Sequence, residues 1–273
     1  MAMICRVLIC AVLLAGANLG ASRAACAQDQ NDAQRAVRWK ELQHAIFADR
    51  PVKDGSGLIE IEAPARALDA ALVPITVMLK GNAHVRGLYL VIDENPGPLA
   101  GHFMFGPQSD PRVLKLRVRV NAYTYIHAVL ETSDDQLYSV ARFVKASGGC
   151  SAPAGPDDGE ALKDMGHMKL RLLEPFSAGK SIEAQLMIRH PNFNGMQMSQ
   201  VTRLVTPPRF IRSIDVTYDG AQVLHLDSDI SLSTDPVITF GFVPQEKGRM
   251  QVVVQDTSDA SFSDSFEVPA PNG

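Results

Sequence analysis

Hydrophobic and polar residues alternate over short stretches along most of the chain, a pattern typical of β-strands with one buried face. Leu58-Ile59-Glu60-Ile61-Glu62 is a clear early example. Turn-forming residues separate the alternating runs and no internal helix interrupts them, which indicates an antiparallel sandwich. In the first half we predict strands at Leu58–Glu62, Val73–Leu79, Gly87–Ile92, Val113–Val120, Tyr123–Leu130 and Leu137–Val144, with His102–Phe105 as a further candidate.

The second half shows the same kind of alternation without repeating the sequence of the first. Asp219-Gly220 is a hairpin signal between two of its runs, and Pro207-Pro208 marks a stop before another. The pattern predicts a second, slightly smaller β-sandwich. Its strands are expected at Met168–Leu173, Ser181–Ile188, Phe210–Tyr218, Ala221–Leu226, Val237–Phe242, Arg249–Gln255 and Ser261–Val268.

One stretch has helical periodicity. Between Asp32 and Phe47, the side chains of Trp39, Leu42 and Ile46 fall on one face, and Asn31 or Asp32 can cap the start. The predicted fold is therefore all-β: two immunoglobulin-like antiparallel β-sandwich domains joined by a flexible Gly/Pro-rich loop, with a short N-terminal helix. The expected boundaries are a signal peptide at 1–27, the first domain at 28–145, the loop at 146–166 and the second domain at 167–273.

The first 27 residues have the features of an export signal. Arg6 supplies a positive start, and the apolar run from Val7 to Ala17 is too short to span a bilayer comfortably. Cleavage after Ala25-Cys26-Ala27 would leave Gln28 as the first mature residue. We therefore expect a periplasmic protein without membrane insertion after signal cleavage. Acylation of Cys26 is an alternative, although Arg23 stands where a lipoprotein signal wants an aliphatic residue.

Charge argues against one class of partner. The whole chain carries a formal net charge of −4, and the expected leader contains Arg6 and Arg23 but no acid. Removing the leader makes the mature protein more acidic still. Nucleic-acid binding needs a basic face, so we expect no nucleic-acid partner.

The loop between the two halves carries a cysteine. The segment from Lys145 to Glu160 holds four glycines and two prolines, with Cys150 near its centre. The other three cysteines lie in the expected leader, which makes Cys150 the only thiol of the mature protein. A lone cysteine in an exported chain is either buried and inert or kept for chemistry. Because its neighbours are small, we predict an exposed, reactive thiol.

Other candidate sites are weaker. The basic residues of Val113–Val120 alternate onto one face, which a solvated sheet surface explains better than an anion site. A copper-handling role is a further alternative, since thioethers and imidazoles are soft ligands; its residues would be Met165, His167, Met168, His190, Met196 and Met198. No Ser-His-Asp order, carboxylate pair or phosphate loop stands out. We therefore expect no catalytic constellation, no metal and no cofactor.

The order of several motifs resembles the bacterial sulfur-oxidation carriers. The first half resembles SoxY in the run from Ala63 to Val77, in Ile92–Pro98, in Phe103–Phe105 and in the approach to Gly148-Gly149-Cys150. The second half resembles SoxZ in Arg189-His190-Pro191 with Gly195, in Pro208–Ile211, in Asp229–Pro236 and in Arg249–Thr257. The single-chain arrangement is similar to fused SoxYZ-like carriers associated with quinoprotein dehydrogenases.

The resemblance implies a function for the loop. Cys150 would be the point of covalent cargo attachment, and Gly148 and Gly149 would form its flexible arm. The implied partners are periplasmic redox enzymes, either Sox-type or linked to a quinoprotein dehydrogenase. Two features depart from the family pattern: Ser151 and Ala152 replace trailing glycines, and the arm continues into a second domain instead of ending. An alternative is a non-covalent interaction protein for a quinoprotein dehydrogenase system.

Overall fold

The computed structural model describes residues 31–80, 84–153, 158–199 and 201–268, so the predicted signal peptide and its cleavage site lie outside the described residues. The chain divides after Ala48 into two compact units. In the first unit, residues 31–47 are helical, in agreement with the predicted helix, and Asp32 pairs with Arg35 at 2.9 Å. Neither helix in the described part of the chain combines the length and the apolar character that crossing a bilayer requires.

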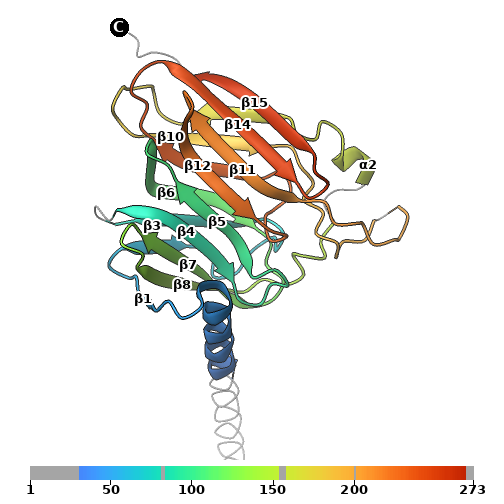
Figure 1. Cartoon of the computed structure of the whole chain (residues 1–273). Helices are drawn as coiled ribbons and strands as arrows, with labels where there is room; N and C mark the ends of the chain where they lie inside the picture. Colours follow the sequence, from blue (N-terminus) through green and yellow to red (C-terminus); the bar gives the residue numbers. More distant parts are fainter. Residues whose placement is uncertain (1–30, 81–83, 154–157, 200, 269–273) are drawn as a thin grey trace, which may run out of the picture. The chain divides into compact units, whose positions relative to one another are not determined.

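The second unit is built from two β-sheets and one short helix, α2 (Asp158–Ala161) (Figure 1). The larger sheet has nine strands, in the order β1 (Val52–Asp54), β8 (Leu137–Val144), β7 (Thr124–Thr132), β4 (Val85–Ile92), β5 (Leu99–Phe105), β12 (Ala221–Ser228), β11 (Ile211–Tyr218), β14 (Gly248–Asp256) and β15 (Ser261–Val268). The smaller sheet has six, in the order β2 (Ile59–Glu62), β3 (Val73–Leu79), β6 (Ser109–Val118), β13 (Val237–Phe242), β10 (Ile182–Ile188) and β9 (Met168–Leu172).

Both sheets run without a break from the first half of the chain into the second. In the larger sheet, β5 pairs with β12 in antiparallel register, with Phe103 opposite Leu226. In the smaller sheet, β6 pairs with β13, with Leu114 opposite Phe240. The predicted all-β class is confirmed, but the two sandwiches share both of their sheets. Alternation along a strand shows which face is buried and carries no information on which strand lies at each edge.

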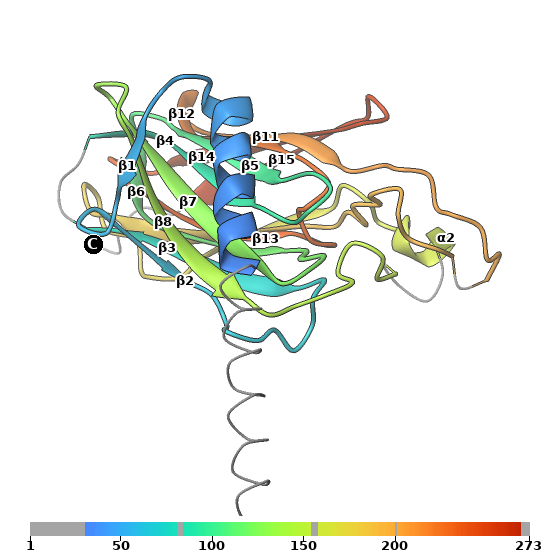
Figure 2. The same ribbon diagram turned by 90° about the horizontal axis from the view of Figure 1, so that it is seen from below.

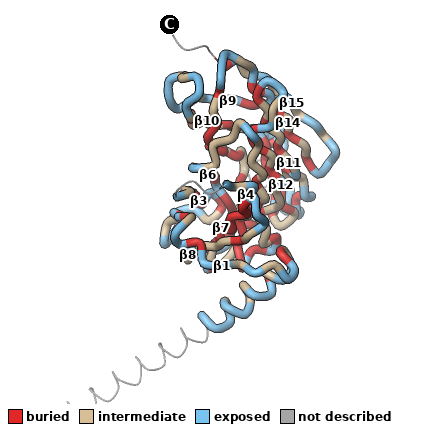
Figure 3. Tube along the Cα trace, turned by 60° about the vertical axis from the view of Figure 1, so that its left-hand side comes forward, coloured by how far each residue is buried: buried red, intermediate tan, exposed pale blue. Residues whose placement is uncertain are grey.

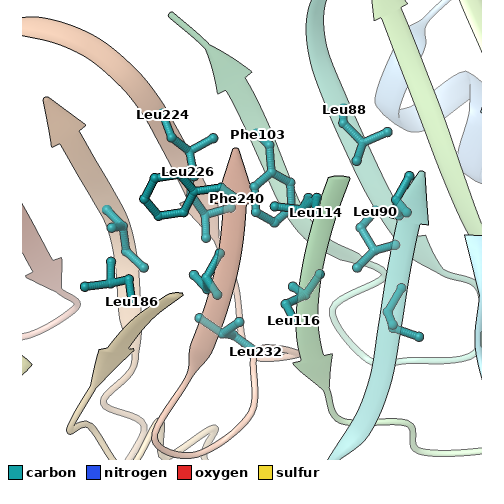
Figure 4. Packing of buried hydrophobic residues seen from close by; sticks show 14 of the residues in the cluster. Leu88, Leu90, Phe103, Leu114, Leu116, Leu186, Leu224, Leu226, Leu232 and Phe240 are labelled. Atoms are coloured by element: carbon teal, nitrogen blue, oxygen red, sulfur yellow. The ribbon is translucent and has the colours of Figure 1, made fainter. Parts of the chain in front are cut away.

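The hydrophobic core fills the space between the two sheets. Leu88 and Phe103 point inward from the larger sheet toward Leu114 and Phe240 of the smaller one (Figure 4). These four side chains are each at most 2% exposed, and burying a side chain of this size stabilises the fold by roughly 1.5–3 kcal/mol. Buried residues follow the inner strands of both halves (Figure 3). One continuous core therefore holds both halves together.

Local turn chemistry behaves as the sequence predicts. The hairpin between β11 and β12 turns at Asp219 and Gly220, whose φ angles are 47° and 81°. Positive φ at both central positions is the geometry that favours an Asp-Gly pair. The sequence patterns missed β1, which pairs in parallel with β8. They also missed the start of β6, which begins at Ser109, before the predicted alternation.

Candidate functional site

Cys150 lies in a tight turn between the end of β8 and α2. Its side chain is 0% exposed, so the prediction of an exposed thiol is wrong for this structure. The segment that follows β8 and the loop that follows β10 extend from the same end of the sheets (Figure 2). We call residues 148–152 the cysteine turn. Its burial comes from residues distant in sequence, since its immediate neighbours are small.

The first half of the chain holds the two glycines of the cysteine turn. The backbone N–H of Gly148 donates to Asn121 O at 2.9 Å, and that of Gly149 donates to Val120 O at 3.0 Å. A Cβ on Gly149 would lie 2.0 Å from Ala70 O, and Gly148 has a φ of 79°. The glycines thus permit close backbone approach and a left-handed turn. The pair that we predicted as a flexible arm is held by hydrogen bonds in this structure.

The second half of the chain closes over the same turn. Asn194 Nδ2 donates to the carbonyl oxygen of Cys150 at 2.7 Å, and Gln197 Nε2 donates to that of Ala152 at 2.9 Å. Asn194 is itself oriented by its Oδ1, which accepts the N–H of Met196 at 3.0 Å. Both amide side chains belong to the loop between β10 and β11. The cysteine is therefore enclosed by groups from both halves.

Arg119 is a charged residue that contacts the cysteine turn, through the carbonyl oxygen of Gly149. It follows the last residue of β6, and its backbone N–H donates to Ser231 O at 2.8 Å. We predicted the basic residues of this run on a solvated face. That holds for Arg117, which is exposed, and is wrong for Arg119, which is 0% exposed. The regular strand ends at Val118, so the alternation no longer decides which way the next side chain points.

Burial and charge act in opposite directions on the thiol. Burial raises the pKa of Cys150, and the positive charge of Arg119 partly offsets that rise. Burial also lowers the pKa of Arg119 to about 10, although Cys150 and Asp69 act to raise it. In the closed turn the neutral thiol is therefore favoured over the thiolate. A buried neutral thiol is a weak nucleophile, because the thiolate is the reactive form.

Two residues of the copper alternative, His190 and Met168, are buried in the fold. His190 is buried, its Nδ1 accepts the N–H of Asn192 at 3.1 Å, and its Nε2 lies 3.5 Å from Asp256 Oδ2. Met168 is buried in the hydrophobic core, and Met198 is about half exposed, at 47%. Among the residues that the structure describes, no group of three His, Cys, Asp or Glu side chains is arranged to hold a metal ion.

Sequence reasoning missed three residues that build the site: Arg119, Asn194 and Gln197. Each contacts the cysteine turn from at least thirty residues away in the chain. The one local signal is that Arg119 is the last basic residue of the alternating run Val113–Val120. Composition alone does not distinguish it from Arg117.

Two different family models match the chain, one in its first half and one in its second half. A family model described as sulfur oxidation protein SoxY matches residues 43–150, and one described as sulphur oxidation protein SoxZ matches residues 171–267. The first match ends at Cys150. None of the curated proteins matches this sequence.

Three solved structures are similar to parts of the chain. The sulfur carrier protein SoxY from Chlorobium limicola f thiosulfatophilum is 25% identical, with a TM-score of 0.37, covering 43% of this chain and 98% of that one. A β-glycosidase from Bacteroides vulgatus is 12% identical, with a TM-score of 0.24, covering 77% and 24%. A family 2 glycosyl hydrolase from Bacteroides cellulosilyticus DSM 14838 is 10% identical, with a TM-score of 0.22, covering 82% and 30%. At these TM-scores none of the three carries an argument about function.

Proposed function

Because the chain belongs to the SoxY and SoxZ sulfur carrier family, with one domain of each kind fused in a single chain, we propose that it carries a sulfur intermediate covalently on Cys150. Proteins of this family are sulfur carriers and not enzymes. The cargo would be sulfur derived from thiosulfate. The carrier would present it to redox enzymes of the periplasm, either Sox-type or linked to a quinoprotein dehydrogenase.

The observation that supports this proposal is the position of the cysteine turn. Cys150 is the only cysteine among the described residues, and it lies where groups from both domains meet. The hydrogen bonds from Asn194 and Gln197 end on backbone carbonyls of the turn and leave the sulfur itself without a hydrogen-bond partner among the described residues. A turn held mainly through its backbone can release its side chain without disturbing the sheets.

The attachment chemistry needs a thiolate and an oxidant. The sulfur of Cys150 and the outer sulfur of thiosulfate would join through a new S–S bond, with the thiol proton going to water. Forming that bond releases two electrons, which pass to the partner redox enzyme. Exchange with another thiolate breaks the bond again, which makes the attachment reversible.

Burial of Cys150 means that loading requires two conformations. We infer that the closed state described here alternates with an open one in which the cysteine turn leaves its place between the domains. Besides the long contact from Arg119 to Gly149 O, opening would break four hydrogen bonds, each worth about 0.5–1.5 kcal/mol net. They are the donations from Gly148 and Gly149 to the first domain and those from Asn194 and Gln197 to the turn. This cost lies within the range that docking of a partner protein can supply.

Intact-protein mass spectrometry tests the carrier function directly. The protein is taken unreduced from the exported fraction of cells grown on thiosulfate, and peptide mapping locates any added mass. We expect a sulfur-containing mass on Cys150 that a thiol reductant removes. A bare thiol under every growth condition would overturn the proposal.

A matched variant separates the carrier from a purely non-covalent interaction protein. Cys150→Ser keeps a small polar side chain in the turn and removes the sulfur. We expect it to fold and to bind the same partners, yet to hold no cargo and to abolish sulfur oxidation. Full activity of Cys150→Ser would favour the non-covalent role instead.

A further inference from the structure

A buried positive charge without a negative partner lies beside the cysteine turn. Arg119 is 0% exposed, and in the described part of the chain every contact of its guanidinium is with an uncharged oxygen. The contacts are Gly149 O at 3.5 Å, Pro191 O at 3.4 Å, Asn192 O at 3.3 Å and Thr234 Oγ1 at 2.6 Å. Its Nε has no hydrogen-bond partner among the described residues. Only the Thr234 contact is short, so the charge is poorly compensated.

A buried arginine without a counter-ion destabilises the folded protein unless an anion pairs with it. An arginine taken out of water without a counter-ion loses several kcal/mol of solvation, and buried charges are normally paired. The ionisable groups whose charge acts on Arg119 are Cys150 and, with a smaller effect, Asp69. The carboxylate of Asp69 already accepts the N–H of Ala71 at 2.8 Å. Arg119 Nη1 also lies 3.5 Å from the carbonyl oxygen of Gly149, the residue directly before Cys150, and Cys150 is itself 0% exposed. The sulfur of Cys150 is therefore the group best placed to supply the missing negative charge.

We propose that Arg119 and Cys150 together form an anion site, in which Arg119 stabilises the sulfur when it carries a negative charge. Arg119 would stabilise first the thiolate of the empty carrier and then the negative charge of an acidic sulfur adduct. This inference rests on the proposed carrier function and adds to it a residue, Arg119, that would stabilise the anionic end of the cargo. A cargo with an anionic end, such as a sulfonate, is favoured over a neutral one of equal size. Arg119 is a positioning residue in this scheme.

An anion site should distinguish a negatively charged adduct from a neutral adduct of the same shape. Any group added to Cys150 has to fit beside a sulfur-bearing residue that is 0% exposed, and its bulk destabilises the closed state. Only a negatively charged group gains an attraction to the guanidinium, and in a buried setting that attraction is weakly screened. Two adducts that differ in charge and not in size should therefore differ in the stability of the folded protein.

Alkylation provides such a pair. The Cys150 thiolate displaces iodide from iodoacetate to give a carboxymethyl thioether, or from iodoacetamide to give its neutral carbamidomethyl isostere. Both bonds are irreversible, and peptide mapping verifies that Cys150 is fully modified in each sample. The melting temperatures of the two folded proteins are then compared at neutral pH. We expect the carboxymethyl form to melt higher, by about 3 °C, which corresponds to about 1 kcal/mol for a protein of this size.

Two variants show whether Arg119 causes the difference. Arg119→Met removes the buried charge and should abolish the gap between the two adducts. Arg117→Met removes an exposed charge two residues away and should preserve it. If Arg119→Met fails to fold, the comparison in the unsubstituted protein decides by itself. Equal melting temperatures, or a higher one for the neutral adduct, would overturn the proposal.

The outcome is separable from that of the carrier test. Cargo found on Cys150 together with equal melting temperatures would refute the anion site and leave the carrier function standing. A higher melting temperature for the carboxymethyl form in a protein that never holds cargo would refute the carrier function and retain the charge pairing.

Discussion

Gly149→Ala places a methyl group where two backbone carbonyls already stand. The new Cβ would lie 2.0 Å from Ala70 O and 2.7 Å from Val120 O. Cβ contacts below 3.0 Å essentially do not occur in real proteins, so a shift of at least about 1 Å is needed. Because both obstacles belong to the backbone, neither can turn aside as a flexible side chain does.

The strain should be relieved by opening the cysteine turn. Overpacking of this kind typically costs about 1–3 kcal/mol. If the cost falls on the closed turn alone, the ratio of open to closed molecules rises by about 5- to 150-fold. A sulfur that is 0% exposed has to become accessible before it can be alkylated, so the alkylation rate of Cys150 should rise by at least about fivefold.

The assay is the rate of reaction of Cys150 with iodoacetamide in the folded protein, located by peptide mapping. Gly57→Ala is the matched control, since a Cβ at Gly57 would meet no atom within 4 Å. It should react at the rate of the unsubstituted protein. A Gly149→Ala protein that melts several degrees lower yet alkylates at the unchanged rate would refute the reasoning. The strain would then be spread over the whole fold.

Three further predictions concern the same region and the join between the domains. Asn194→Asp keeps the acceptor for the N–H of Met196 and removes the donor to Cys150 O. It should raise the alkylation rate about fivefold, and an unchanged rate would show that this hydrogen bond does not hold the turn closed. Because burial raises the pKa of Cys150 in the folded state, its contribution to stability is complete below about pH 8.5 and declines as the pH rises above that value. In urea unfolding from pH 7 to 10, stability relative to Cys150→Ser should therefore fall, and a constant difference would contradict this assignment. Cleavage at a protease site inserted between Pro153 and Asp158 should leave the two fragments associated in gel filtration, because both sheets cross the join; fragments that elute separately would show that strand pairing alone does not hold the domains together.

Many of the strands were predictable because they have one buried face and one more exposed face. Val73–Leu79 was predicted with the bounds that the structure has, since alternation there matches the burial of every second residue. β1 was missed because its three residues, Val52–Asp54, contain a single apolar side chain. The pairing of β5 with β12 also could not be predicted from the sequence. It depends on edges that meet in space, and no pattern along one strand identifies its neighbour.

The burial of Cys150 could not be predicted from the sequence, and its role as the attachment site stays a prediction. Cysteine identity and spacing pointed to Cys150, because those features are local. The glycines around Cys150 were interpreted as a sign of backbone flexibility, whereas Gly149 is needed for the close approach of its backbone to Ala70. The same residue type serves both purposes, so the sequence alone could not choose. Arg119 was placed in solvent because the alternation was extended one residue pair beyond the end of β6.

The enclosed sulfur has a consequence for how an unloaded carrier survives in an oxidising compartment. The structure describes no second cysteine that could resolve a sulfenic acid, so a peroxide that reached the thiol would start it toward irreversible sulfinic and sulfonic acids. A fully covered sulfur also cannot meet the same sulfur of another molecule to form a cross-linked dimer. In the proposed carrier, the closed turn would therefore protect the empty thiol from oxidative damage, and the time spent open would set its working lifetime.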